Sequence, residues 1–103
     1  MLGSKDELIK KFQSEVDQAD WEMLTPHFER QALFKVSDGL DLFEVAADLA
    51  LDNVEEIQKI LTSGLLKRAS EEDKNKYGLD KNKFFANFLV IQPYVIFQEY
   101  KEN

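Results

Sequence analysis

Residues 33–68 decide the fold, and they read LFKVSDGLDLFEVAADLALDNVEEIQKILTSGLLKR. The pattern predicts a short strand at 33–36, two helices joined by a tight turn, and a second short strand at 65–68. The first helix is apolar around most of its circumference, which is typical of a helix buried on most sides. Gly64 follows the second helix, where a left-handed residue commonly ends a helix.

Capping motifs mark the helix starts. Ser4 with Glu7, and Asp41 with Glu44, have the spacing of capping boxes. We therefore expect a first helix from residue 5 to about 17–19. Thr25-Pro26 is a further start signal, because a hydroxyl precedes a proline at the first helical position. Further helical segments are predicted at 20–24, 26–31 and 70–77, the last of them polar, solvated and loosely held.

The region 83–100 carries much of the aromatic content and is predicted to be strand. Apolar residues fall on both of its faces, which indicates an inner strand covered on both sides. The chain must turn or bend at Gln92-Pro93, since proline cannot donate to a sheet ladder. We predict a single α+β domain, 1–103, with four or five helices packed on a small three- or four-stranded sheet and a helix-turn-helix-like helix pair between two short strands. The predicted core residues are Val45, Leu49, Ile57, Leu61, Phe88 and Val90.

Composition excludes several functions. The chain has 103 residues and no cysteine, which excludes disulfides, thiolate nucleophiles and cysteine-ligated metals. Its longest apolar run, 88–91, is far shorter than the ~20 residues of a membrane span. The first residues turn polar at once, so we expect no signal-peptide core and a cytoplasmic protein without membrane contact.

The charge distribution disfavours a nucleic-acid-binding function. Helix-turn-helix regulators share the order of elements in 33–68, so a winged-helix-like nucleic-acid-binding domain is the alternative reading. However, the second helix opens with Glu55 and Glu56, where a DNA reader needs positive or amide side chains. The net charge of −7 also repels phosphate backbones, so we expect no physiological nucleic-acid binding. The one basic stretch supplies the candidate patch of Lys67, Arg68, Lys74, Lys76, Lys81 and Lys83.

No residue pattern points to catalysis, and we predict that the chain is not an enzyme and holds no cofactor. It lacks the phosphate-binding, dinucleotide, serine-hydrolase and zinc-protease motifs. His27 is the only histidine, and we favour a surface or packing role for it over an acid–base role. An acidic stripe is more consistent with a solvated helix face than with a small metal- or ligand-binding site. The stripe consists of Asp41, Glu44, Asp48 and Asp52.

The aromatic C-terminus has two interpretations. Core packing is the simpler one. The other is a partner or subunit interface, because aromatic residues at a sheet edge can pair with another chain. The residues of this candidate interface are Tyr94, Ile96, Phe97 and Tyr100. We predict a noncatalytic protein-interaction or regulatory module that contacts an unknown protein partner or forms a homodimer.

Several short motifs together resemble a known bacterial family. They are Leu40-Asp41-Leu42, Val45-Ala46, Ala50 with Asp52-Asn53, and the closing QPYVIFQE of 92–99. This combination resembles the domain-of-unknown-function family numbered 2288, over about 19–99. The chain has Ile60 where members often have tryptophan. The resemblance implies a bacterial cytoplasmic domain and adds no site residues.

Overall fold

The computed structural model describes residues 4–79 and 84–100. The predicted α+β class is confirmed, with five helices in the described residues, but the sheet has five strands rather than three or four. In chain order the elements are α1 (Lys5–Glu15), β1 (Asp17–Ala19), α2 (Trp21–Glu29), β2 (Leu33–Val36), α3 (Leu42–Ala50), α4 (Val54–Thr62), β3 (Leu66–Arg68), α5 (Glu71–Leu79), β4 (Ala86–Ile91) and β5 (Tyr94–Glu99).

The strands form one sheet in the order β1-β4-β5-β2-β3. β4 and β5 are an antiparallel hairpin that turns at Gln92-Pro93, and β5 then runs parallel to β2, with Leu33 opposite Val95. β3 lies antiparallel on the outer side of β2. The helix pair α3–α4 therefore lies between two short strands, as predicted, and these two strands are neighbours in the sheet. β5, the last strand of the chain, is the middle strand of the sheet.

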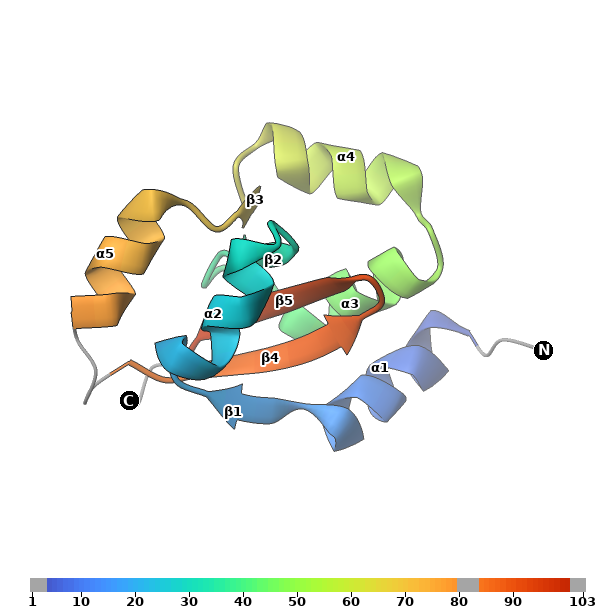
Figure 1. Cartoon of the computed structure of the whole chain (residues 1–103). Helices are drawn as coiled ribbons and strands as arrows, with labels where there is room; N and C mark the ends of the chain where they lie inside the picture. Colours follow the sequence, from blue (N-terminus) through green and yellow to red (C-terminus); the bar gives the residue numbers. More distant parts are fainter. Residues whose placement is uncertain (1–3, 80–83, 101–103) are drawn as a thin grey trace.

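Helices cover both faces of the sheet (Figure 1). Helices α1, α3 and α4 lie on one face, and α2 and α5 lie on the other. Side-chain alternation in β5 shows the two layers, because Ile96 packs toward α3 while Val95 and Phe97 pack toward α2 and α5. A central strand covered on both sides explains the apolar residues on both faces of the C-terminal segment.

Local capping chemistry places the helix ends that the sequence predicts. The Ser4 hydroxyl accepts a hydrogen bond from the Glu7 amide at 3.3 Å. A carboxylate oxygen of Asp41 accepts from the amides of its capping box, including that of Glu44 at 3.3 Å. Gly64 ends α4 with φ +77°, a conformation in which a side chain would add strain.

Strand β1 is the first correction. The initial helix was expected to continue to about 17–19, but α1 ends at Glu15 and Val16 is already extended. Asp17 then pairs with Phe88 and Ala19 with Ala86, so β1 forms the edge of the sheet beside β4. A three-residue strand is too short for an alternating pattern to show, and tertiary pairing decides its conformation.

Helix α2 is the second correction, because one helix replaces the two pieces predicted on either side of residue 25. Asp20 caps it through a side-chain hydrogen bond to the first turn. The Thr25 hydroxyl, expected to cap a later helix, instead donates to the Trp21 carbonyl at 2.9 Å. Pro26 lies inside the helix on its exposed side, where water can satisfy the carbonyl left without a partner.

The predicted core was centred on the wrong layer. Val45 is buried, whereas Leu61 is 40% exposed and Val90 is 48% exposed, so the prediction is wrong for the latter two. Leu49, Ile57 and Phe88 are half-buried. The sheet and the aromatic layer beneath it form the centre instead. The largest fully buried side chains are Phe97, Leu24, Leu33, Ile96, Val36 and Val95.

Helix α5 also departs from its prediction as a solvated, loosely held helix. Tyr77 is only 2% exposed. Its ring centroid lies 4.2 Å from that of Phe84 and 5.8 Å from that of Trp21. One aromatic residue therefore anchors an otherwise polar helix. In the described residues, no helix has both the length and the apolar character needed to span a bilayer.

Candidate functional site

An apolar groove runs between α4 and the face of the sheet that α3 covers. Its volume is about 170 Å³. The walls are almost entirely apolar, so a charged ligand would lose its hydration there without gaining hydrogen bonds. We call this feature the α4 groove, and it is lined by Phe34, Leu49, Ile57, Leu61, Leu66, Tyr94 and Ile96.

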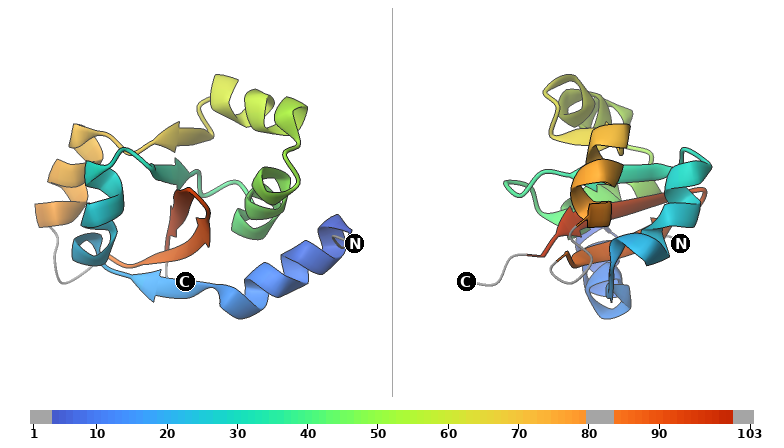
Figure 2. Two further views of the ribbon diagram at one scale, coloured as in Figure 1. Left: turned by 45° about the vertical axis from the view of Figure 1, so that its right-hand side comes forward. Right: turned by 60° about the vertical axis from the view of Figure 1, so that its left-hand side comes forward.

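The α4 groove exists because α4 packs incompletely on the rest of the fold. Asn53 lies at the N-cap of α4, but its side chain donates to Asp48 at 2.9 Å and makes no capping hydrogen bond. No residue of α4 is fully buried, although its apolar residues recur with helical spacing. Figure 2 shows α4 at the periphery of the molecule. An amphipathic helix in this position leaves part of its apolar side uncovered.

Exposed residues of α4 extend this apolar surface toward solvent. Val54 is 62% exposed and Leu61 is 40% exposed, and Gln58 is exposed between them. Their spacing of four and three residues places them on one side of the helix. We call Val54, Gln58 and Leu61 the α4 strip. The strip carries no formal charge, in a chain whose net charge is −7.

Sequence reasoning assigned Ile57 and Leu61 to the core and therefore missed the groove. The amphipathic pattern of α4 supports two interpretations equally, a helix packed in the core and a helix that lines a groove. What separates them is the position of α4 relative to the sheet, which depends on contacts between distant segments.

The predicted C-terminal interface is only partly on the surface. Ile96 and Phe97 are completely buried, so the prediction that they contact a partner is wrong. The physical reason is that β5 is the middle strand and both of its edges are paired. Tyr94 and Tyr100 are exposed. Tyr94 lines the α4 groove and packs edge-on against Phe34, with 5.6 Å between ring centroids.

The candidate basic residues do not form one patch in the described part of the chain. Lys67 and Arg68 are consecutive in β3 and point to opposite faces of the sheet. The Arg68 guanidinium lies 5.4 Å from the centroid of the Phe34 ring, on the face that α3 covers. Lys74 is 4.0 Å from a carboxylate oxygen of Glu71. Lys67 and Lys76 line a common polar cleft with Lys35, whereas Lys81 and Lys83 lie outside the described residues.

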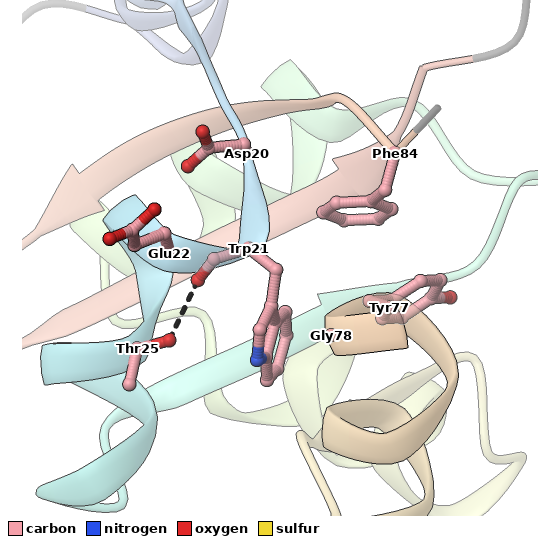
Figure 3. Close-up of a pocket in the computed structure, with 7 residues that line it drawn as sticks. All are labelled: Asp20, Trp21, Glu22, Thr25, Tyr77, Gly78 and Phe84. Carbon is pink, nitrogen blue, oxygen red and sulfur yellow. Dashed lines mark hydrogen bonds between the residues drawn. The ribbon is translucent and has the colours of Figure 1, made fainter. Parts of the chain in front are cut away.

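A second cavity of about 280 Å³ lies between the start of α2 and the end of α5 (Figure 3). The rings of Trp21, Tyr77 and Phe84 line it, but they are buried against one another and offer little free surface. Two of its polar groups are engaged in the fold, because Asp20 caps α2 and the Thr25 hydroxyl bonds to the helix backbone. Glu22, the remaining acidic residue of the lining, is exposed to solvent. This cavity is therefore the outer margin of the aromatic core.

The acidic stripe was expected to be a solvated helix face, and this expectation is wrong for Asp48. Asp48 is only 7% exposed. One of its carboxylate oxygens lies 3.1 Å from the ammonium of Lys5 and accepts a hydrogen bond from Asn53 at 2.9 Å. The hydrogen bond to Asp48 raises the pKa of Lys5 despite the opposing effect of burial. These contacts tie α1, α3 and the start of α4 together, so Asp48 is engaged in the fold.

His27 lies in the last turn of α2 and contacts Arg30. A guanidinium nitrogen of Arg30 lies 3.0 Å from the Nδ1 atom of His27, and the other terminal nitrogen donates to the Pro93 carbonyl at 3.0 Å. Burial lowers the pKa of His27, and the neighbouring positive charge of Arg30 lowers it further. Since guanidinium can only donate, the contact requires Nδ1 to be an unprotonated acceptor.

We predict that His27 makes stability fall as the solution is acidified. The folded-state pKa lies below the ordinary value of 6.5, so the unfolded chain binds more protons below that value. The contribution of His27 is complete above pH 6.5 and decreases as the pH falls toward the folded-state pKa. Urea midpoints of wild type and His27→Asn, measured between about pH 5 and 7.5, should diverge, with the flatter profile for Asn. Parallel profiles would contradict the prediction.

Comparisons with known proteins agree with this fold. A family model described as protein of unknown function (DUF2288) matches residues 7–99. The NMR solution structure of PA1075 from Pseudomonas aeruginosa is similar, with a TM-score of 0.78 and 32% sequence identity, and the similarity covers 99% of this chain and 93% of that one. A search of curated proteins gives no match. The family resemblance expected from residues 40–53 and 92–99 is thereby confirmed.

Proposed function

We propose that this chain, which belongs to the DUF2288 family of proteins of unknown function, has a noncatalytic function. It acts by protein–protein contact through α4. The observation that carries the proposal is the α4 groove together with the α4 strip beside it. Both are apolar or neutral, and both reach solvent. Contiguous exposed apolar surface on a small domain commonly marks an interaction site.

The partner that these features fit best is a second copy of the chain. Two molecules that each carry a charge of −7 repel each other, so they must meet where neither presents charge. The α4 strip meets that condition. A two-fold axis is the commonest symmetry of homo-oligomers, and it requires a surface that is complementary to itself.

An antiparallel arrangement of two α4 helices satisfies this requirement. With the two-fold axis near Gln58, Val54 of one copy lies near the C-terminal turn of the other helix. Glu55 of each copy then lies on the same flank as Lys59 of the other, which gives opposite charges at the margin of the contact. The helix dipoles also run in opposite directions. The mouth of each α4 groove would be covered by the partner helix.

Light scattering over a concentration series tests the proposal. A contact of this size is expected to be transient, with a dissociation constant of roughly 10 μM to 1 mM. The mass should therefore rise from 12.0 kDa toward twice that value with increasing concentration. Val54→Glu should keep the protein monomeric, since it introduces a charge into each half of the contact. The substitution suits the first turn of a helix, so the fold should persist.

Val90→Glu is the matched control, because Val90 is also an exposed valine, at 48%, but lies on the opposite face of the sheet. This variant should associate like wild type. A wild-type mass of one chain at about 1 mM, or equal effects of the two substitutions, would contradict the proposal.

The winged-helix-like alternative receives less support from the arrangement of charges. A recognition helix would present Glu55, Glu56, Gln58 and Lys59, all of which are exposed. The basic residues that would contact phosphates are divided between the two faces of the sheet, as Lys67 and Arg68 illustrate. Arg68 lies on the face of the sheet that α3 and α4 cover, close to Phe34, whereas Lys67 points to the opposite face.

A further inference from the structure

A polar cleft opens where the β2–β3 edge of the sheet meets α5. Its volume is about 330 Å³, within the size range of small-ligand sites. Lys35, Lys67 and Lys76 come to it from three separate elements, with Asp38 and Glu99 as the acidic members. We call it the lysine cleft. Its lining therefore carries a formal charge of +1, in contrast to the acidic chain as a whole.

The positions of Lys35 and Lys67 are unfavourable without a ligand. They are direct partners in the antiparallel register of β2 and β3, and like charges at opposed positions destabilise a sheet. A lysine on an edge strand such as β3 protects the edge from pairing with other chains. That protection requires only Lys67, so it does not explain a second lysine facing it from β2.

The third cation, Lys76, contacts the same tyrosine ring as Lys35, that of Tyr77. The ammonium groups of Lys35 and Lys76 lie 5.0 Å and 5.2 Å from the centroid of the Tyr77 ring, within the range of a cation–π contact. The Tyr77 hydroxyl donates to a carboxylate oxygen of Glu99 at 3.1 Å. Burial of Tyr77 fixes this ring, so the ring orients two lysines and one carboxylate of the cleft.

These cations are weakly neutralised by the protein itself. The ammonium of Lys35 is 3.9 Å from a carboxylate oxygen of Asp73, a long contact for an ion pair. In the described part of the chain, neither Lys67 nor Lys76 forms an ion pair with a carboxylate. Three lysines that line one cleft, two of them without an ion pair to a described carboxylate, match an anion that carries more than one negative charge.

We propose that the lysine cleft binds a small phosphate-bearing ligand, with Lys35, Lys67 and Lys76 as the ligating cations. Lysine binds phosphate as a point charge, and a phosphate dianion would convert the repulsion between Lys35 and Lys67 into two attractions. The volume of the cleft exceeds that of a single phosphate group, so pyrophosphate or a phosphomonoester fits better than a bare ion. The proposal is independent of self-association through α4.

Amide chemical shifts of the full chain, titrated with pyrophosphate and separately with adenosine monophosphate, test the proposal. Ionic strength is held at about 0.15 M, because charged contacts weaken with salt. Amides around Lys35, Lys67 and Lys76 should shift and saturate with at least one of the two ligands. Acetate, which carries a single negative charge, should produce little change at the same concentration. A response to the monophosphate alone would assign the ligand as a phosphomonoester, and a response to both would assign the phosphate group as the recognised element.

Lys67→Gln should weaken binding by about tenfold, the loss expected for one charge-assisted contact. Lys74→Gln is the matched control, since Lys74 is exposed on the same helix as Lys76 but does not line the lysine cleft. It should bind like wild type. Without ligand, Lys67→Gln should unfold at the same or a higher urea concentration than wild type, because it removes the repulsion with Lys35.

Three results would overturn the proposal. The first is the absence of saturable shifts in the cleft with either phosphate ligand. The second is an equal loss of binding in Lys67→Gln and Lys74→Gln. The third is tighter binding of a short DNA duplex than of either phosphate ligand at the same amides, which would favour a nucleic acid instead.

Discussion

Truncating Trp21 to alanine should lower the free energy of unfolding by about 3–5 kcal/mol, the range for large aromatic residues in a core. Trp21 is 7% exposed. Its ring lies within 5.6–6.3 Å of four other aromatic rings, measured between centroids. The substitution would leave a cavity among α2, α5 and the sheet, because the Trp21 ring contacts aromatic rings from all three. The four neighbouring rings are those of Phe28, Tyr77, Phe84 and Phe97.

Urea denaturation of Trp21→Ala and Met23→Ala measures this effect with a control on the same helix. Met23 is 56% exposed, so its truncation should cost less than about 0.5 kcal/mol, as is usual for surface positions. A loss below about 1 kcal/mol for Trp21→Ala would show that the aromatic layer is not the centre of this half of the fold.

Truncating Ile96 to alanine should cost about 2–5 kcal/mol, whereas truncating Tyr94, two residues earlier in the same strand, should cost less than about 1.5 kcal/mol. Ile96 is fully buried in the middle strand, and Tyr94 is 42% exposed at the start of that strand. The contrast follows from the sheet order, since a strand paired on both sides buries its inward residues completely.

The same denaturation experiment compares Ile96→Ala with Tyr94→Ala. Equal and small losses would place β5 at an edge of the sheet, as the aromatic C-terminal segment first suggested. A large loss for Ile96→Ala alone would agree with the central position and would restrict any contact made by this segment to Tyr94 and Tyr100.

Elements whose ends are set by local chemistry could be predicted from the sequence. The capping boxes at Ser4 and Asp41 and the left-handed Gly64 each depend on residues within one helical turn. They placed the starts of α1 and α3 and the end of α4 correctly. The strand before α3 was also predicted correctly, because a short apolar run ends there at a turn.

Features set by pairing between distant segments could not be predicted. β1 is a strand only because β4 lies beside it, and nothing in residues 17–19 marks it locally. The central position of β5 depends on its pairing with β2 across more than 50 residues. α5 is firmly held by one buried ring, that of Tyr77, because it meets Trp21 and Phe84 in the folded chain.

The candidate sites were likewise predictable only where local sequence patterns define them, and not where contacts between distant segments do. The amphipathic pattern of α4 is visible in the sequence, but it does not show that Val54 and Leu61 stay exposed. The basic residues Lys67 and Lys76 were identified from the sequence, whereas Lys35 was not, because it lies in a strand about 30 residues earlier. Register between β2 and β3 brings Lys35 opposite Lys67, and only the assembled sheet supplies that register.

Self-association through α4 is tested most directly by an isotope-filtered NOE experiment on an equimolar mixture of labelled and unlabelled chain at about 1 mM. Such spectra report only contacts between different molecules, and they require no substitution. Contact through the α4 strip predicts intermolecular NOEs from the methyl groups of Val54 and Leu61, and from the ring of Tyr94. Intermolecular NOEs confined to other surfaces, or none at this concentration, would contradict the proposal that this chain acts through α4 by pairing with a second copy.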